Sequence, residues 1–201
     1  MTTIRQEDFI QSVRNALQYI SYYHPIDFVR AMHAAYEKEQ SVAARDAIAQ
    51  ILVNSRMCAE GHRPICQDTG VVVVFLKVGM DVRFEGDMSL YDMINEGVRQ
   101  AYLHPDNKLR ASMVEPPIGA RKNTKENTPA IIYTDLVPGD RVDVALAAKG
   151  GGSENVGAQY KLPDAKLKAG RDLEGVRRCV IDAVYNAQGK GCAPGSIGVG
   201  I

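Results

Sequence analysis

One continuous apolar run, residues 71–76, constrains the fold of this 201-residue chain more than any other stretch. The run contains four valines followed by Phe75 and Leu76, and it comes directly after the polar stretch Cys66-Gln67-Asp68-Thr69-Gly70. Apolar runs of this length between polar residues are typical of buried strands. We therefore predict a strand over residues 68–78, and we expect the polar residues at its entrance to be held in a fixed turn.

Apolar residues recur at three- and four-residue steps in several stretches, which is the pattern of amphipathic helices. Pro25, Ser41 and Ser89 lie where helices are expected to begin, and all three residue types favour that position. Helices are predicted, in chain order, over residues 7–21, from residue 25, from residue 41 towards 57, over residues 89–103 and over residues 172–187.

Two further strands are predicted over residues 130–136 and 141–148, on either side of the turn sequence Val137-Pro138-Gly139-Asp140. This arrangement predicts an antiparallel hairpin. Residues 196–201 have the pattern of another strand, and the polar segment 105–129 is predicted to be a long loop. Loops of that length inside a compact domain are often functional.

The order of these elements predicts an α+β fold. An N-terminal helical module, residues 1–60, leads into a mixed or antiparallel sheet flanked by helices, residues 61–201. We expect the two parts to form one integrated domain, cut short at its C-terminal end.

The charge balance indicates a small ligand. The chain has 24 basic and 24 acidic residues and no block of like charges, so we expect neither nucleic acid nor a membrane surface as a partner. No run approaches the roughly 20 apolar residues of a membrane span, and the N-terminus lacks the pattern of a secretory signal. We therefore expect a cytoplasmic protein. The four cysteines are few for a chain of this size and include no CxxC pair, so we expect reduced thiols and neither a disulfide scaffold nor a compact zinc site.

Three polar clusters lie at predicted strand ends, in residues 66–70, 149–155 and 192–195. Each joins glycines to groups that can bind an anion or a metal. Asp68 is a candidate general acid or base, although an Asp before Thr-Gly is also a common turn residue. Asn123-Thr124 and Asn127-Thr128 could each bind a carboxylate or form an Asx turn, and Gly150-Gly151-Gly152 could be a simple turn.

The four cysteines fall into two groups. Cys179 lies on the apolar face of its predicted helix, so we expect it to be buried, and Cys58 lies at a helix end. Cys66 and Cys192 lie in Gly- or Pro-containing turns beside polar groups, where a thiolate can face a cavity. Thiolates this far apart in sequence suit an iron–sulfur cluster as well as zinc.

Three motifs carry a family resemblance: Ile65-Cys66-Gln67-Asp68-Thr69-Gly70, Lys149-Gly150-Gly151-Gly152-Ser153-Glu154-Asn155 and the stretch 191–201. They resemble the signatures of class I (iron–sulfur) fumarate hydratases and L-tartrate dehydratases. Residues 54–64 are similar to the single-chain bacterial class I fumarases. The resemblance implies a [4Fe-4S] hydro-lyase that interconverts fumarate and L-malate, with three irons bound by cysteines and the fourth open to substrate.

The resemblance also assigns roles to residues of this chain. Cys66 and Cys192 match two cluster ligands, and Asp68 matches a candidate for proton transfer. The substrate-binding residues implied by the resemblance are Gln67, Arg110, Asn123, Thr124, Lys149, Gly150, Gly151, Gly152 and Ser153.

Two positions depart from the family pattern. One branch of the family has a cysteine where this chain has Leu146, and the other branch takes its third cysteine from beyond residue 201. The family pattern after the cysteine is commonly Pro-Pro, where this chain has Ala193-Pro194. The third cluster ligand is therefore not identified in this chain.

The resemblance covers the first part of the family sequence. We therefore expect one subunit or a piece of a longer protein that needs a C-terminal domain or beta subunit for turnover. We also expect a dicarboxylate substrate and a homo-oligomer. Two alternatives stay open: a subunit of a dehydratase for tartrate or another hydroxy-diacid, and a non-catalytic interaction module.

Overall fold

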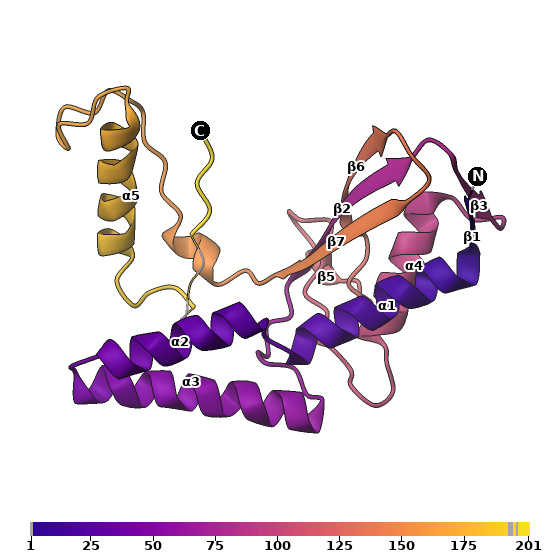
Figure 1. Cartoon of the computed structure of the whole chain (residues 1–201), viewed down its shortest axis with the longest axis horizontal. Helices are drawn as coiled ribbons and strands as arrows, with labels where there is room; N and C mark the ends of the chain where they lie inside the picture. The colour runs from indigo at the N-terminus through magenta and orange to yellow at the C-terminus, as the bar shows by residue number, and fades with distance from the viewer. Residues whose placement is uncertain (1, 193–194, 196) are drawn as a thin grey trace. The chain divides into compact units, whose positions relative to one another are not determined.

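The chain forms two compact units, Met1–Lys149 and Gly150–Ile201, in a computed structural model that describes residues 2–192, 195 and 197–201. Helices and a mixed sheet together make up the first unit (Figure 1), so the predicted α+β class is confirmed. A boundary at residue 60 stays a prediction. None of the described helices is both long enough and apolar enough to cross a bilayer.

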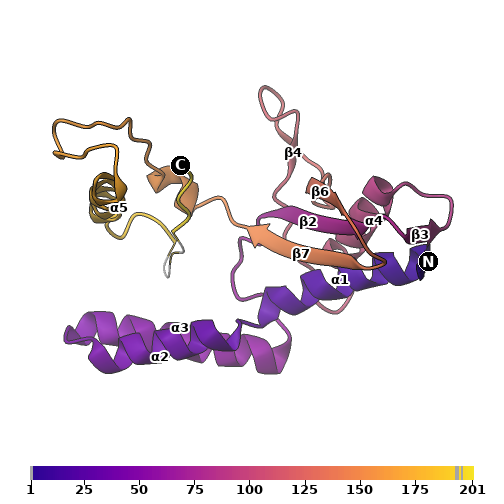
Figure 2. The same ribbon diagram turned by 45° about the horizontal axis from the view of Figure 1, so that its top comes forward.

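The first helices lie where the apolar spacing predicted them. Helix α1 spans Gln6–Tyr22, α2 spans Ile26–Lys38 directly after Pro25, and α3 spans Val42–Gly61. The Ser41 hydroxyl accepts a hydrogen bond from the Ala44 amide at 3.4 Å, which caps α3 as expected. Helices α2 and α3 pack side by side (Figures 1 and 2).

Helix α4, Leu90–Tyr102, packs on α1 and begins at the predicted cap Ser89, whose hydroxyl accepts from the Asp92 amide at 3.1 Å. The two helices approach closely because α4 carries a glycine at the crossing: a Cβ on Gly97 would lie 2.7 Å from Val13 Cβ. One side of the sheet packs on these helices, with α1 running beneath it (Figure 2).

Strand β2, Val71–Gly79, is the central strand, and its side chains alternate between two environments. Val72, Val74, Leu76 and Val78 are buried against α1 and α4. The opposite face is more open than predicted, because Phe75 is 50% exposed. The strand is therefore buried on one face, and its first predicted residues, 68–70, form the turn that leads into it.

The predicted hairpin of residues 130–148 is wrong, because β2 lies between its two strands. Strand β6, Ile131–Val137, pairs with β2 in parallel, and β7, Val142–Lys149, pairs with β2 antiparallel, which gives the order β6-β2-β7. Local sequence predicts the turn between β6 and β7 correctly but carries no information about a third strand inserted between them.

The residues at the end of β2 are hydrogen-bonded to the backbone of this turn. The Gly79 amide donates to the Arg141 carbonyl at 2.8 Å, and the Asp81 amide donates to the Gly139 carbonyl at 2.9 Å. A Cβ on Gly79 would lie 2.3 Å from the Gly139 carbonyl oxygen, so only glycine fits here without a shift of the backbone. The sheet order therefore depends on a residue about 60 positions before the turn it contacts.

Two short ladders complete the first unit. Strand β1, Thr2–Arg5, pairs in parallel with β3, Val82–Glu85. Strands β4, Val114–Glu115, and β5, Lys122–Asn123, pair antiparallel inside the segment predicted as a loop.

The second unit contains the short 3-10 helix η1, Ser153–Val156, and helix α5, Leu173–Ala187. The Asp172 carboxylate caps α5 by accepting from the Gly175 amide at 2.7 Å, and Cys179 is buried as predicted. The predicted strand at the C-terminal end is wrong for residues 197–201, which have no regular structure, while Ser196 lies outside the described residues. The described part of this unit offers no neighbouring strand with which these residues could pair.

Substitution of Gly79 tests the sheet order. We expect Gly79→Ala to lower the free energy of unfolding by about 1–3 kcal/mol, because its methyl group meets backbone atoms that cannot rotate away. The control is Gly61→Ala, whose Cβ meets Arg63 Cγ at an ordinary 3.8 Å, and which should leave stability unchanged or raised. Urea unfolding followed by circular dichroism measures both variants. Equal midpoints for the two variants would contradict the insertion of β2 beneath the turn.

Candidate functional site

The start of β2 and the end of β7 lie together at one end of the sheet. In the antiparallel register Val71 pairs with Lys149, so Lys149 lies beside the stretch 66–70 at the entrance to β2. Lys149 is the first residue of one polar cluster that sequence placed at a strand end, and residues 66–70 form another. Their meeting follows from the β2–β7 pairing, since antiparallel strands place the entrance of one beside the exit of the other.

The entrance to β2 is a fixed turn, as expected. The Asp68 carboxylate accepts from the Gly70 amide at 3.1 Å, and Gly70 has a φ of 71°, which favours glycine. The Tyr102 hydroxyl donates to the carbonyls of Thr69 at 3.0 Å and Gly70 at 3.3 Å. Burial raises the pKa of the Tyr102 phenol, so the hydroxyl stays protonated and remains a donor.

Residues 110–112 run beside residues 67–69 and bring three of the predicted site residues together. Arg110 donates from Nη1 to Gln67 Oε1, and its carbonyl accepts from the Thr69 hydroxyl at 2.6 Å. The Ser112 hydroxyl donates to Asp68 Oδ1 at 3.5 Å. Gln67 and Arg110 are exposed and Asp68 is half-buried, so a guanidinium, a carboxamide and a carboxylate share one accessible surface.

Asn127 joins these two segments, a role that the sequence did not predict for it. Its Oδ1 accepts from the amides of Ser112 at 2.7 Å and Met113 at 3.2 Å, while its Nδ2 donates to the Gly70 carbonyl at 2.9 Å. The side chain is fully buried. In the sequence, Asn127 is followed by Thr128, as Asn123 is followed by Thr124, and no neighbouring residue shows which of the two asparagines is buried.

Asn123 forms the turn that was one of its two predicted alternatives. Its Oδ1 accepts from the Lys125 amide at 2.7 Å, and its Nδ2 donates to the Ala111 carbonyl at 2.9 Å. Thr124 donates from its amide to the Met113 carbonyl at 3.0 Å, while its buried hydroxyl has no hydrogen-bond partner among the described residues. Both residues thus hold the segment 111–113 that forms one side of the strand entrance.

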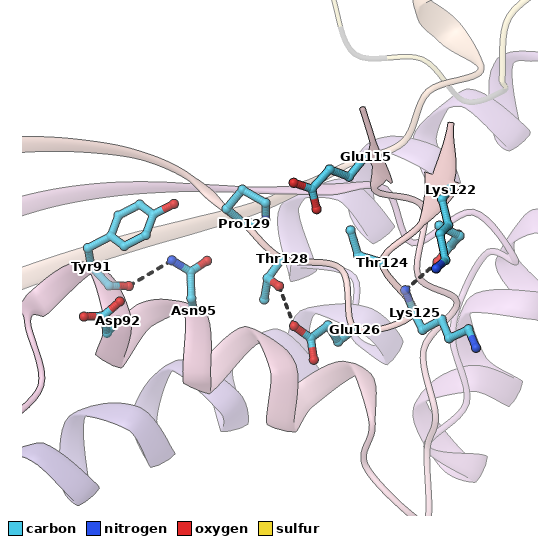
Figure 3. A pocket seen from close by; sticks show the side chains of 11 residues that line it. Tyr91, Asp92, Asn95, Glu115, Lys122, Thr124, Lys125, Glu126, Thr128 and Pro129 are labelled. Carbon is cyan, nitrogen blue, oxygen red and sulfur yellow. Dashed lines mark hydrogen bonds between the residues drawn. The ribbon is translucent and has the colours of Figure 1, made fainter. Parts of the chain in front are cut away.

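A cavity of ≈ 700 Å³ lies beside α4 and the β4–β5 ladder (Figure 3). Carboxylates and lysines both line it, and its walls include Asn123 and Thr124 but not Gln67, Asp68 or Arg110. The cavity is therefore distinct from the surface where the three predicted residues meet. Its lining residues are Tyr91, Asp92, Asn95, Glu115, Lys122, Asn123, Thr124, Lys125, Glu126, Thr128 and Pro129.

In the second unit the glycine loop contacts the last cysteine. A Cβ on Gly152 would lie 2.5 Å from Cys192 Sγ, so the glycine leaves the space that the thiol occupies. Gly150 and Gly151 precede this contact, and the side chain of Ser153 lies outside the described part of the chain. Ala193-Pro194, where the chain departs from the family pattern, also lies outside it.

The cysteines differ in exposure, and Cys179 is buried as predicted, while the position of Cys58 at a helix end had left its burial open. Cys66 and Cys192 are exposed, whereas Cys58 and Cys179 are buried. Burial raises the pKa of the Cys58 thiol, which favours the protonated form. Within the described ranges no three His, Cys, Asp or Glu side chains gather as a metal site.

Comparison with known proteins identifies the family. The family model described as fumarate hydratase (Fumerase) matches residues 10–201. A putative fumarate hydratase class I from Geobacillus stearothermophilus is 38% identical over 183 residues, which cover 88% of this chain and 34% of the relative. A putative L(+)-tartrate dehydratase subunit alpha from Methanocaldococcus jannaschii is 35% identical over 184 residues, covering 89% of this chain and 61% of the relative.

The L(+)-tartrate dehydratase subunit alpha of Escherichia coli strain K12 is 24% identical over 189 residues, covering 94% of this chain and 60% of the relative. The chain thus spans between 34% and 61% of the length of these relatives. The family match extends over almost the whole chain and includes the strand entrance, the glycine loop and Cys192. This chain therefore belongs to the fumarate hydratase (Fumerase) family of hydro-lyases, as a region of the class I fumarate hydratase and tartrate dehydratase alpha type.

Proposed function

We propose that this chain is the N-terminal, cluster-bearing part of a hydro-lyase that interconverts fumarate and L-malate. The observation that carries the proposal is the meeting of Gln67, Asp68 and Arg110 at the entrance to β2. These side chains supply a cation, a hydrogen-bonding amide and a carboxylate on one accessible surface, which are the groups needed to bind a diacid and move a proton.

Arg110 and Gln67 bind one substrate carboxylate in this proposal. A guanidinium presents several N–H groups in a planar fork that suits a carboxylate, and Gln67 adds an amide donor beside it. Asp68 holds the proton that is exchanged with substrate, and the Gly70 amide and Ser112 hydroxyl orient its carboxylate. Lys149 and the glycines after it supply charge and backbone N–H groups for the second carboxylate.

The resemblance implies a [4Fe-4S] cluster, and the donors of this chain fit two of its ligand positions. Cys66 and Cys192 are the exposed thiols, and Gly152 leaves room for the Cys192 sulfur. When bound, the cluster would supply a Lewis acid for the hydroxyl group of the substrate. Leu146 packs against the apolar core, so we assign the third ligand to the family region that this chain does not span.

The same reasoning implies a partner. Two of the relatives are named as alpha subunits, and this chain spans 61% or less of each of these relatives. We therefore assign turnover to an assembly of this chain with a C-terminal domain or beta subunit, as a cytoplasmic oligomer that handles a small dicarboxylate.

A second candidate is a tartrate dehydratase alpha subunit. Its support is the 35% identity to the Methanocaldococcus jannaschii subunit, close to the 38% found with the class I fumarate hydratase. Tartrate and malate differ by one hydroxyl group, and a hydrogen-bonding site can discriminate strongly on that basis. Substrate competition therefore decides between the two candidates.

The substrate proposal is tested by co-expressing the chain with the C-terminal portion of a class I fumarate hydratase and assaying fumarate, mesaconate and tartrate in parallel. We expect fumarate to give the highest kcat/KM. Arg110→Lys should lower that value about tenfold because it loses the planar fork. Arg14→Lys, at a side chain that bonds its neighbour Asn15, is the control and should leave it unchanged. Turnover with tartrate alone would support the second candidate, and no turnover with any acid would favour a non-catalytic module.

The cluster proposal is tested by anaerobic reconstitution of the chain with iron and sulfide. We expect charge-transfer absorbance that weakens in Cys66→Ser and in Cys192→Ser, because each variant removes one thiolate ligand. Cys179→Ala, at the buried helix position, is the control and should keep the absorbance of the unaltered chain. Spectra that are identical in all variants would contradict the assignment of Cys66 and Cys192.

A further inference from the structure

Asn127 has the most buried polar side chain in the described part of the chain. It is 0% exposed, compared with 6% for Asn107 and 7% for Gln18. Its backbone adopts a left-handed conformation with a φ of 66°, which Asn tolerates better than most residues. The hydrogen bonds of its carboxamide are to main-chain atoms of other segments.

The carboxamide of Asn127 offers one acceptor and one donor, as a backbone peptide group does, and uses each on a different segment. One oxygen accepts from the amides of Ser112 and Met113, and the nitrogen donates to the Gly70 carbonyl. A carboxylate keeps only the acceptor, and an alkyl group keeps neither function. The two segments joined in this way lie 14 to 57 residues from Asn127, so the bridge is entirely tertiary.

The other contacts between these segments lie nearer the surface. The bonds from Arg110 to Gln67 and from Thr69 to the Arg110 carbonyl are exposed to solvent, whereas the bond from Asn127 to Gly70 is buried. Tyr102 is also buried, but its hydroxyl contacts the carbonyls of Thr69 and Gly70 on one side of the entrance. Buried hydrogen bonds are the ones that water does not replace when they break.

We propose that Asn127 is a positioning residue that fixes the segment carrying Arg110 and Ser112 against the segment carrying Gln67 and Asp68. The substrate carboxylate then meets a guanidinium and an amide at a set separation. This inference rests on the proposed function of the strand entrance. Asn127 itself contacts neither substrate nor cofactor and acts through the backbone of Gly70, Ser112 and Met113.

Two substitutions of Asn127 distinguish the donor role of the carboxamide from its acceptor role. Asn127→Leu removes donor and acceptor, and Asn127→Asp keeps the acceptor while losing the donor to Gly70. The control is Asn107→Leu, because Asn107 is also buried but its side chain donates to Gln18 at 2.9 Å and Ser21 at 3.3 Å, both on α1, and not to Gly70. All variants are compared at a temperature where circular dichroism shows each to be folded.

Amide hydrogen exchange in the full 201-residue chain is the first readout. We expect Asn127→Leu to speed exchange at Ser112 and Met113 about tenfold or more, and to shift the side-chain N–H signals of Arg110 and Gln67. Asn127→Asp should retain protection at both amides but still shift the Arg110 signal. Asn107→Leu should leave these amides and signals unchanged. If Asn127→Leu does not fold, the pattern of Asn127→Asp decides the question.

Kinetics of the chain completed by a C-terminal portion is the second readout. We expect Asn127→Leu to raise KM for the diacid about tenfold with a smaller effect on kcat, whereas Asn107→Leu leaves KM unchanged. Absence of turnover in the unaltered assembly would count against the proposed function, and the exchange data would still decide the role of Asn127. Equal effects of Asn127→Leu and Asn107→Leu on the Arg110 signal would overturn the inference.

Discussion

The pairing of β2 with a strand on each side is the constraint on which the rest of the first unit depends. One face of β2 buries Val72, Val74, Leu76 and Val78 against α1 and α4, and this burial provides the core of the unit. Both edges of β2 are filled by β6 and β7, so its position in the sheet is fixed from both sides. Gly79 permits this arrangement, since a side chain there would collide with the turn that joins the two neighbours.

The same pairing explains why polar groups distant in sequence meet at one end of the sheet. Because β7 runs antiparallel to β2, its last residue, Lys149, lies beside the entrance of β2. Arg110 reaches the entrance by another route. The segment after it is bound by the side chains of Asn123, at Ala111, and of Asn127, which also donates to the Gly70 carbonyl before β2. A hydrophobic core thus supports a polar surface whose groups come from separate parts of the chain.

Sequence predicted the features that depend on local interactions. The predicted caps Ser41 and Ser89 lie three residues from the amides they bind, so these helix starts were predictable from local sequence. The hairpin was wrong because Gly79 acts on a turn far along the chain. The bridging role of Asn127 was not predicted either, because its partners lie 14 to 57 residues away in sequence. Cys66, Gln67, Asp68 and Arg110 were singled out from their motifs, with their roles resting on the family resemblance.

The central proposal is that Cys66 and Cys192 bind one metal cluster in an enzyme of this family. A trivalent arsenical, which bridges two thiols only when they are neighbours, measures this directly in the folded chain, with peptide mapping by mass spectrometry to locate the bridge. The account predicts one arsenic atom per chain, linking Cys66 to Cys192, and no bridge after either is changed to serine. Mass spectra in which arsenic is bound but never bridges Cys66 and Cys192 would contradict the account.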